Sequence, residues 1–172
     1  MKITQIFSLT VILFLSFLTS CLSNSSDRDY SAWRQQNEEY IKGLETETVD
    51  GHLKYEKIIP DWDPNVYTLM CWHNDREENS NLLTPLSNST VTLNYTLTNV
   101  EGDTIDMAGS FQCVPNNMVT GFWVAVTNMN ENDTVTAVVP YNAGYGVIGS
   151  GGVMPYSTLI FGIRLKKINK LF

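Results

Sequence analysis

Two segments after residue 89 alternate between apolar and polar side chains. This period of two limits the possible folds more than any other feature of the sequence. Such alternation is typical of a β-strand that buries one face and exposes the other. In the first of these strands the apolar residues are Val91, Leu93, Tyr95 and Leu97. In the last strand, over residues 158–166, they are Leu159, Phe161, Ile163 and Leu165. Both strands are therefore expected to be half-buried.

Length and charge exclude several classes of protein. The 172 residues suffice for one domain and a small additional segment. Eleven basic residues against 18 acidic ones give a formal charge of −7, whereas a nucleic-acid binder needs a basic surface. An apolar fraction of 43% argues against a disordered acidic chain. His52 and His73 have no cysteine or histidine at ligand spacing, so no metal site is predicted.

The first residues have the pattern of an export signal. Lys2 precedes an apolar run from Ile6 to Leu18, which is shorter than the roughly 20 residues that a membrane-spanning helix needs. Residues 1–20 are therefore expected to be a signal peptide. The sequence LTSC at 18–21 resembles the bacterial lipobox, which implies that Cys21 is lipidated and becomes the first mature residue. We expect a lipid-anchored protein of the bacterial cell envelope, either facing the periplasm or at the outer membrane.

Residues 21–84 are expected to form a tether and an extension that contains a helix and strands. The spacing of Trp33, Tyr40, Ile41 and Leu44 predicts a helix over 29–45, which Asp27 or Asp29 can cap. Its narrow apolar stripe either packs against its own domain, which we favour, or mediates self-association. A polar loop over 46–53, strands over 53–59 and 66–73, and a loop over 74–88 are expected to follow.

The rest of the chain completes an α+β pattern. Two short strands are predicted over 104–107 and 110–114, a short helix over 117–129, and a strand over 134–139. One short helix laid on a mainly antiparallel sheet is an α+β domain.

Three glycines form a misleading motif. Gly144, Gly146 and Gly149 match the pattern G-x-G-x-x-G of dinucleotide-binding sites. Such a site needs a helix immediately after the glycines, because the helix N-terminus holds the pyrophosphate. The following residues 150–155 (SGGVMP) cannot begin a helix, so we reject the nucleotide interpretation.

The two remaining cysteines leave their redox state open. Export would permit a disulfide between Cys71 and Cys113. Both lie in apolar stretches, which equally suit buried free thiols.

The glycine-rich region fits another pattern far better. Residues 140–146 (PYNAGYG) and 154–161 (MPYSTLIF) resemble the C-terminal half of FKBP-type peptidyl-prolyl cis-trans isomerases. Residues 91–97 (VTLNYTL), 102–106 (GDTID) and 118–122 (MVTGF) resemble earlier segments of that family, in the same order and spacing. The resemblance covers about residues 85–168. It implies an isomerase domain over 85–172 with an FKBP-like antiparallel sheet wrapped on one short helix, preceded by a helical extension.

The resemblance also implies the residues of a substrate pocket. The catalytic set would be Tyr95, Asp106, Phe122, Tyr145 and Phe161. The substrate-binding set would be Ile105, Phe111, Met118, Val119 and Val153. Tyr145 would donate its hydroxyl to the carbonyl before proline, and the Val119 backbone N–H would hold a second carbonyl. No cofactor is implied, and the pocket would accept proline-containing segments of exported proteins or a macrolide-type ligand.

Three positions depart from the family pattern, and a fourth can be aligned in two ways. Ile105 replaces a phenylalanine, Phe122 stands where a tryptophan is frequent, and Met154 replaces a proline. Phe111 aligns with either of two family aromatics, and Cys113 then occupies the second. The leading hypothesis is an isomerase, and the alternative is an FKBP-like binding or chaperone lipoprotein with little or no isomerase activity. A structural lipoprotein that assembles through the 29–45 helix is a third.

Overall fold

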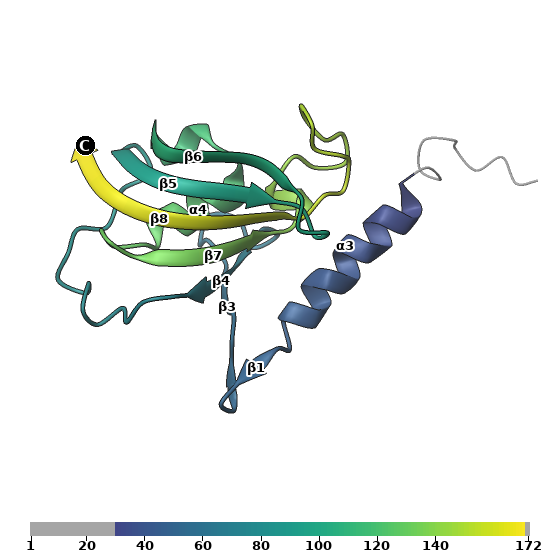
Figure 1. Cartoon of the computed structure of the whole chain (residues 1–172), viewed down its shortest axis with the longest axis horizontal. Helices are drawn as coiled ribbons and strands as arrows, with labels where there is room; N and C mark the ends of the chain where they lie inside the picture. The colour runs from purple at the N-terminus through teal and green to yellow at the C-terminus, as the bar shows by residue number, and fades with distance from the viewer. Residues whose placement is uncertain (1–29, 171–172) are drawn as a thin grey trace, which may run out of the picture. The chain divides into compact units, whose positions relative to one another are not determined.

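A computed structural model describes residues 30–170 of the chain (Figure 1). The predicted signal peptide, Cys21, the tether and the candidate helix caps Asp27 and Asp29 lie outside the described residues. Among residues 30–170, no helix has the length and apolar character needed to cross a membrane.

Six antiparallel strands form one sheet, in the order β3-β4-β7-β8-β5-β6 (Figure 1). The strands are β3 (Glu56–Ile58), β4 (Thr68–Trp72), β5 (Thr90–Thr98), β6 (Thr104–Cys113), β7 (Thr134–Val139) and β8 (Leu159–Lys170). The two alternating segments of the sequence are β5 and β8, and they pair with each other along their length. The predicted α+β class is confirmed.

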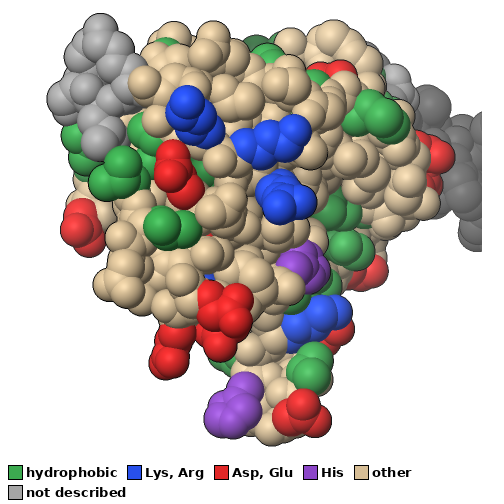
Figure 2. Space-filling model, turned by 60° about the vertical axis from the view of Figure 1, so that its left-hand side comes forward, with side chains coloured by type: hydrophobic (Ala, Val, Ile, Leu, Met, Phe, Trp, Pro, Cys, Tyr) green, Lys and Arg blue, Asp and Glu red, His purple; other side chains and the backbone are tan. Residues whose placement is uncertain are grey.

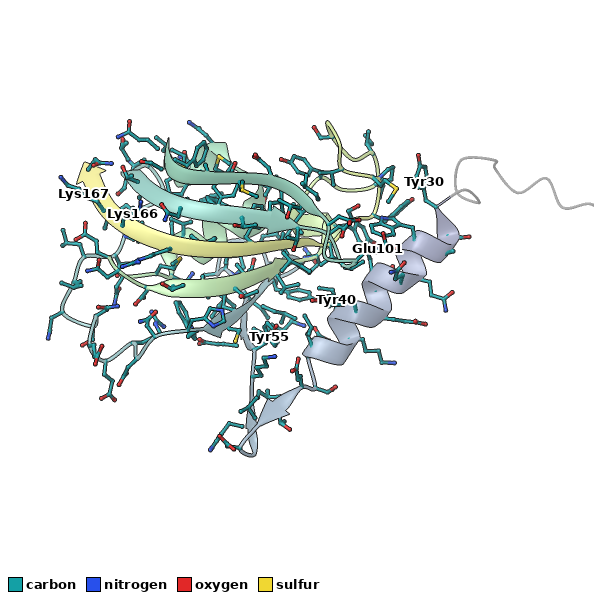
Figure 3. The ribbon with its side chains drawn as sticks, in the orientation of Figure 1. Tyr30, Tyr40, Tyr55, Glu101, Lys166 and Lys167 are labelled. Atoms are coloured by element: carbon teal, nitrogen blue, oxygen red, sulfur yellow. The ribbon has the colours of Figure 1, made fainter. Side chains whose placement is uncertain are left out.

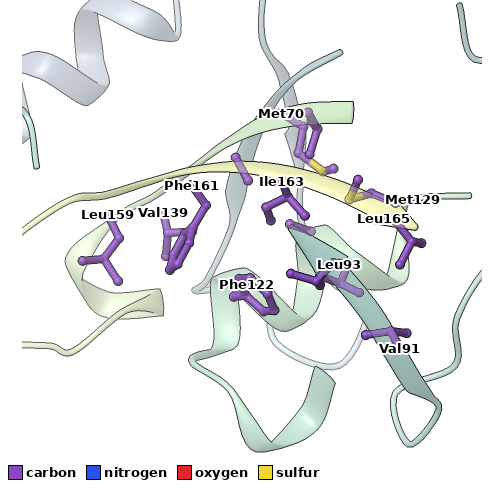
Figure 4. Close-up of a cluster of buried hydrophobic side chains, with 14 of the residues drawn as sticks. Met70, Val91, Leu93, Phe122, Met129, Val139, Leu159, Phe161, Ile163 and Leu165 are labelled. Carbon is purple, nitrogen blue, oxygen red and sulfur yellow. The ribbon is translucent and has the colours of Figure 1, made fainter. Parts of the chain in front are cut away.

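One face of the sheet is covered by α4 (Thr120–Thr127), a helix that is apolar on nearly every side. Phe122, Val126 and Met129 pack against the apolar face of β5 and β8, as Figure 4 shows for Phe122 and its neighbours. α4 begins three residues later than the helix predicted over 117–129, because η1 (Pro115–Asn117) is a separate 3-10 turn. Met118 and Val119 between the two have extended backbones, which interrupts the helix.

The two short strands predicted over 104–107 and 110–114 are a single strand, β6. Its pairing with β5 shifts by one residue between the pairs Leu93–Phe111 and Tyr95–Ala108. A bulge of this kind keeps a strand continuous while it breaks the regular alternation, and Gly109 lies within it. The interrupted sequence pattern therefore marked the bulge and not the end of a strand.

The helix predicted over 29–45 is α3 (Ser31–Leu44), and it packs on the face of the sheet opposite to α4. Ile41 forms a buried cluster with Leu69 of β4 and Val138 of β7. Tyr40 and Tyr55 lie between the helix and the sheet (Figure 3) and pack against this cluster. The apolar stripe is thus used within the chain's own fold, as we favoured.

The segment 46–53 was predicted to be a loop, but it contains a small hairpin. Its strands are β1 (Thr48–Val49) and β2 (His52–Leu53). Asp50 and Gly51 both have positive φ angles, 51° and 81°, which is the backbone of the tight two-residue turn that joins such strands.

The main sheet extends across the predicted boundary at residue 85. β4 pairs with β7, and Val66 and Met70 belong to the same buried cluster as Phe122. Residues 56–72 are therefore structurally part of the domain that contains β5 to β8.

Cys71 and Cys113 are both free thiols. They lie on β4 and β6, which are separated by three strands of the sheet. Neighbouring strands are about 4.8 Å apart, so the two residues are well beyond the roughly 7 Å that a disulfide can bridge between Cα atoms.

Charged side chains are unevenly distributed over the surface. Figure 2 shows Lys and Arg side chains gathered on part of one face, with acidic side chains beside and below them. Lys166 and Lys167 lie toward the end of β8 that is remote from α3 (Figure 3).

Candidate functional site

Four aromatic rings, from three strands and a helix, meet on the face of the sheet that α4 covers. Tyr95 of β5 makes an edge contact with Phe111 of β6, with ring centroids 5.2 Å apart. Phe122 of α4 makes an edge contact with Phe161 of β8 at 5.1 Å. Tyr95 also lies 6.5 Å from Phe122 and 6.4 Å from Phe161, so it joins the two pairs.

Burial differs across this group of rings. Phe122 and Phe161 are 1% and 4% exposed, whereas Tyr95 and Phe111 are only half-buried. The site therefore has a buried apolar floor and an accessible aromatic wall. This combination suits an apolar ligand group that enters from solvent.

Asp106 of β6 is the carboxylate of the site. Its Oδ2 accepts a hydrogen bond from the Tyr95 hydroxyl, and its Oδ1 accepts one from the backbone N–H of Met107 at 2.8 Å. The second bond orients the carboxylate, which in turn orients the Tyr95 ring. Because the Met107 donor is a main-chain group, no side-chain pattern in the sequence could have revealed it.

Burial of the Tyr95 hydroxyl, followed by its hydrogen bond to Asp106, raises its pKa to about 12. The proton therefore stays on Tyr95 throughout the neutral range. An electrostatic effect of Tyr145 contributes to this raised pKa of Tyr95, so the two side chains lie within electrostatic reach of each other.

Tyr145 lies in the loop between β7 and β8 and is 38% exposed. A tyrosine that is neither packed in the core nor placed on regular structure keeps its hydroxyl available to a ligand. Val153 of the same loop packs against the core cluster that contains Phe122 and Phe161.

The remaining predicted residues border the same cluster. Ile105, Met118 and Val119 are partly buried and pack against it. Val119 is the N-cap of α4, and none of the described groups accepts a hydrogen bond from its backbone N–H. The structure thus brings together nine of the ten residues that the sequence predicted for the site, and the tenth, Tyr145, lies within electrostatic reach of Tyr95.

Phe111 and Cys113 both pack against the core cluster of the site. Their contacts show which of them provides the aromatic side chain that the family pattern has in this region. Phe111 contacts Tyr95 directly, while Cys113 is a partly buried neighbour whose thiol pKa is raised to about 11 by burial. Such a thiol is protonated and unreactive at neutral pH. We assign the aromatic contact to Phe111.

Trp123 and His73 make their contacts outside this group of rings. Trp123 stacks on Trp62 with centroids 4.7 Å apart, and His73 is an exposed residue bonded to Thr136. Between residues 30 and 170, no three His, Cys, Asp or Glu side chains converge to hold a metal.

The raised pKa of Tyr95 predicts a stability loss in alkali. In the unfolded chain Tyr95 ionises near its ordinary pKa of 10, before the folded chain does. The free energy of unfolding should therefore fall as the pH rises from 10 toward 12. Urea unfolding at pH 8, 10 and 11 should show a smaller fall for Tyr95→Phe than for the wild type.

The pKa of Tyr67 is also raised to about 12, chiefly by burial, so Tyr67→Phe is the matched control. It should reduce the alkaline fall independently of the candidate site. An unchanged pH dependence in Tyr95→Phe would contradict the assignment of the raised pKa to Tyr95.

Comparison with known protein families supports the resemblance that the sequence motifs indicate. Residues 83–166 match the family model described as FKBP-type peptidyl-prolyl cis-trans isomerase. This part of the chain is an FKBP-type domain. All ten predicted site residues lie within this match, because their positions fall between 95 and 161.

One curated relative is similar to a short segment of the chain. A segment of 55 residues is 40% identical to the macrophage infectivity potentiator of Trypanosoma cruzi, which corresponds to 31% of this chain and 28% of the relative. The chain thus matches less than a third of that curated relative's length.

Two solved structures share the fold at 18% sequence identity. One is a peptidyl-prolyl cis-trans isomerase from Pseudomonas syringae, with a TM-score of 0.67 over 82% of this chain and 96% of that one. The other is FkpA from Escherichia coli, with a TM-score of 0.69 over 95% of this chain and 72% of that one. The predicted FKBP-like fold is confirmed.

Proposed function

We propose that the FKBP-type domain catalyses cis–trans isomerisation of X-Pro bonds in exported proteins. The observation that carries the proposal is the group of four aromatic rings, in which Asp106 accepts a hydrogen bond from Tyr95. Tyr145 lies within electrostatic reach of Tyr95. The family match over residues 83–166 supports it.

Isomerisation of an X-Pro bond does not require a reactive side chain. The barrier is about 18–20 kcal/mol because the peptide C–N bond has partial double-bond character. Both isomers of an X-Pro bond are populated, so catalysis only has to favour the twisted amide over the planar one. The twisted amide is less dipolar, so the floor formed by Phe122 and Phe161 favours it relative to water.

Polar groups at the edge of the site would fix the substrate. The Tyr145 hydroxyl would donate to the carbonyl before proline, and the Val119 N–H would donate to a second carbonyl. Asp106 holds the Tyr95 ring against the site through its hydrogen bond. No nucleophile, base or metal takes part.

A cis–trans assay on a proline-containing peptide tests the proposal. It would use the chain from residue 25 onward, which keeps every described residue. We expect catalysis by the wild type and a loss of kcat/KM of about fivefold in Tyr145→Phe, the equivalent of one neutral hydrogen bond. Asp106→Asn removes a charged acceptor and should lose about tenfold or more.

Trp62→Phe is a control outside the site, because Trp62 stacks on Trp123 and touches none of the four rings. It should keep wild-type activity. A wild-type rate equal to uncatalysed exchange would instead favour an FKBP-like binding or chaperone protein. Full activity in both site variants would refute the assigned roles.

We further propose that Cys21 anchors the protein in the bacterial envelope. The motif at 18–21 supports this, and two or more acyl chains would anchor stably because each buried CH₂ contributes about 0.8 kcal/mol. In a bacterial host supplied with labelled fatty acid, the full chain should carry the label in the membrane fraction, and Cys21→Ser should carry none. Labelling of Cys21→Ser would contradict the assignment.

A further inference from the structure

The loop over residues 140–158, between β7 and β8, carries Tyr145 and Val153 and so forms one side of the site. It begins with the 3-10 turn η2 (Tyr141–Ala143). The Gly146 N–H donates to the Tyr141 carbonyl at 2.8 Å, and the Tyr156 N–H donates to the Gly146 carbonyl at 3.0 Å. The two ends of the loop are therefore joined close to Tyr145.

The returning end of this loop has an unfavourable backbone. Tyr156 has a φ of 62°, in the left-handed region that residues with bulky side chains rarely occupy. Such a conformation persists only where the surroundings hold it in place. The ring of Tyr156 makes an edge contact with Tyr141 at 5.3 Å, and the Arg34 guanidinium of α3 lies over it at 5.0 Å.

Two further side chains of α3 bind the residues after Tyr156. The Trp33 Nε1 donates to the Ser157 hydroxyl at 3.1 Å, and that hydroxyl donates to the Met154 carbonyl at 2.7 Å. The Thr158 N–H donates to Asn37 Oδ1 at 2.6 Å. Trp33, Arg34 and Asn37 thus contact three consecutive residues of the loop.

Asn37 is the most informative of these residues. It is 1% exposed, and its Nδ2 donates to the Trp33 carbonyl at 2.8 Å. Asparagine is a weaker helix former than alanine, so its place in the middle of α3 is not explained by the stability of the helix. Its two hydrogen bonds connect the helix backbone to the loop.

The connection is polar and not a packed interface. A cavity of about 480 Å³ lies between α3 and the start of the loop, lined among others by Ile41, Tyr141 and Thr158. Apolar packing therefore does not fill the space between the helix and η2. The hydrogen bonds of Asn37 and Trp33 and the Arg34 ring contacts carry the connection.

We propose that α3 holds the 140–158 loop in the conformation that places Tyr145 at the site, with Asn37 as the principal positioning residue. This inference rests on the proposed isomerase function for its catalytic consequence. The helix lies outside residues 83–166, so the proposal gives this earlier part of the chain a role in the site.

The test compares Asn37→Ala and Trp33→Phe with Gln36→Ala, an exposed position on the same helix. Amide hydrogen exchange of Gly146 and Val153, both bonded within the loop, should be about tenfold faster in Asn37→Ala, while amides of β5 keep their rates. Trp33→Phe keeps an aromatic ring but loses the indole N–H donor, so it should show the same change to a smaller extent. Gln36→Ala should match the wild type.

A double-mutant cycle tests whether the effect passes through Tyr145. Asn37→Ala should lower kcat/KM about fivefold in the wild type, and by less than about twofold in a Tyr145→Phe background. A variant that was merely less folded would lose the same factor in both backgrounds.

Unchanged exchange in Asn37→Ala would overturn the proposal, because the loop would then not depend on α3. An equal loss of kcat/KM in both backgrounds would also overturn it. A wild-type chain without isomerase activity would overturn the proposed function alone. The exchange rates would then still decide whether α3 holds Tyr145 in place.

Discussion

Replacing Phe122 by alanine should lower the free energy of unfolding by about 3–5 kcal/mol, because the ring is 1% exposed and its removal leaves a cavity. The same change removes the floor of the candidate site and the edge contact with Phe161. Isomerase activity should therefore fall further than in Tyr145→Phe, even under conditions where the variant is fully folded. Urea unfolding and the proline-peptide assay measure the two effects separately.

Phe122→Leu is the matched control for this prediction. It keeps an apolar side chain of similar volume at the same position, so the loss of stability should stay below about 1.5 kcal/mol. Activity should be reduced but present. If Phe122→Ala were as stable as Phe122→Leu, the ring would not be the packed residue that the structure shows.

The second large effect is expected at Gly121, where α4 lies against Val139 of the sheet with no space for a side chain. A Cβ atom added there would be 2.2 Å from Cγ1 of Val139. The helix cannot easily move away, because the Gly121 carbonyl accepts a hydrogen bond from Thr68 of β4 at 3.0 Å. Gly121→Ala should therefore destabilise the fold by about 3 kcal/mol, the upper end for overpacking.

Two further variants make the Gly121 prediction specific. Gly43→Ala is the same substitution in α3, where an added Cβ meets nothing within 4 Å. Because alanine is the better helix former, Gly43→Ala should leave stability unchanged or raise it. Combining Gly121→Ala with Val139→Ala should cost at least about 1 kcal/mol less than the sum of the single changes. Additive costs would mean that the two side chains do not meet.

Local sequence patterns were sufficient for most of the sheet and for the site. The alternation in β5 and β8 predicted both strands, because one face of each is buried along nearly its whole length. The site residues came from resemblance and not from periodicity, since Phe161 and Tyr95 have the same alternating pattern as core residues. The structure brings these residues together, and their catalytic roles stay predictions.

What the sequence could not show depends on contacts between distant residues. The bulge at Gly109 divides the pattern of β6, so one strand was predicted as two. β4 joins the sheet only through β7, more than 60 residues later, so nothing local marked it as part of the same sheet. The bond from Thr158 to Asn37 spans 121 residues, and an asparagine on a helix gives no sign of such a partner.

The order of strands in the sheet has a consequence for how the chain folds. β8 lies between β7 and β5 and pairs with both, although it is the last strand in the sequence. Until residues 159–170 are synthesised, β5–β6 and β4–β7 have no strand between them, so the six-stranded sheet cannot form. Pairings of such long sequence separation form slowly, because loop closure must precede them. During synthesis, the strand pairs β5–β6 and β4–β7 can therefore be joined into one sheet only after β8 has been made.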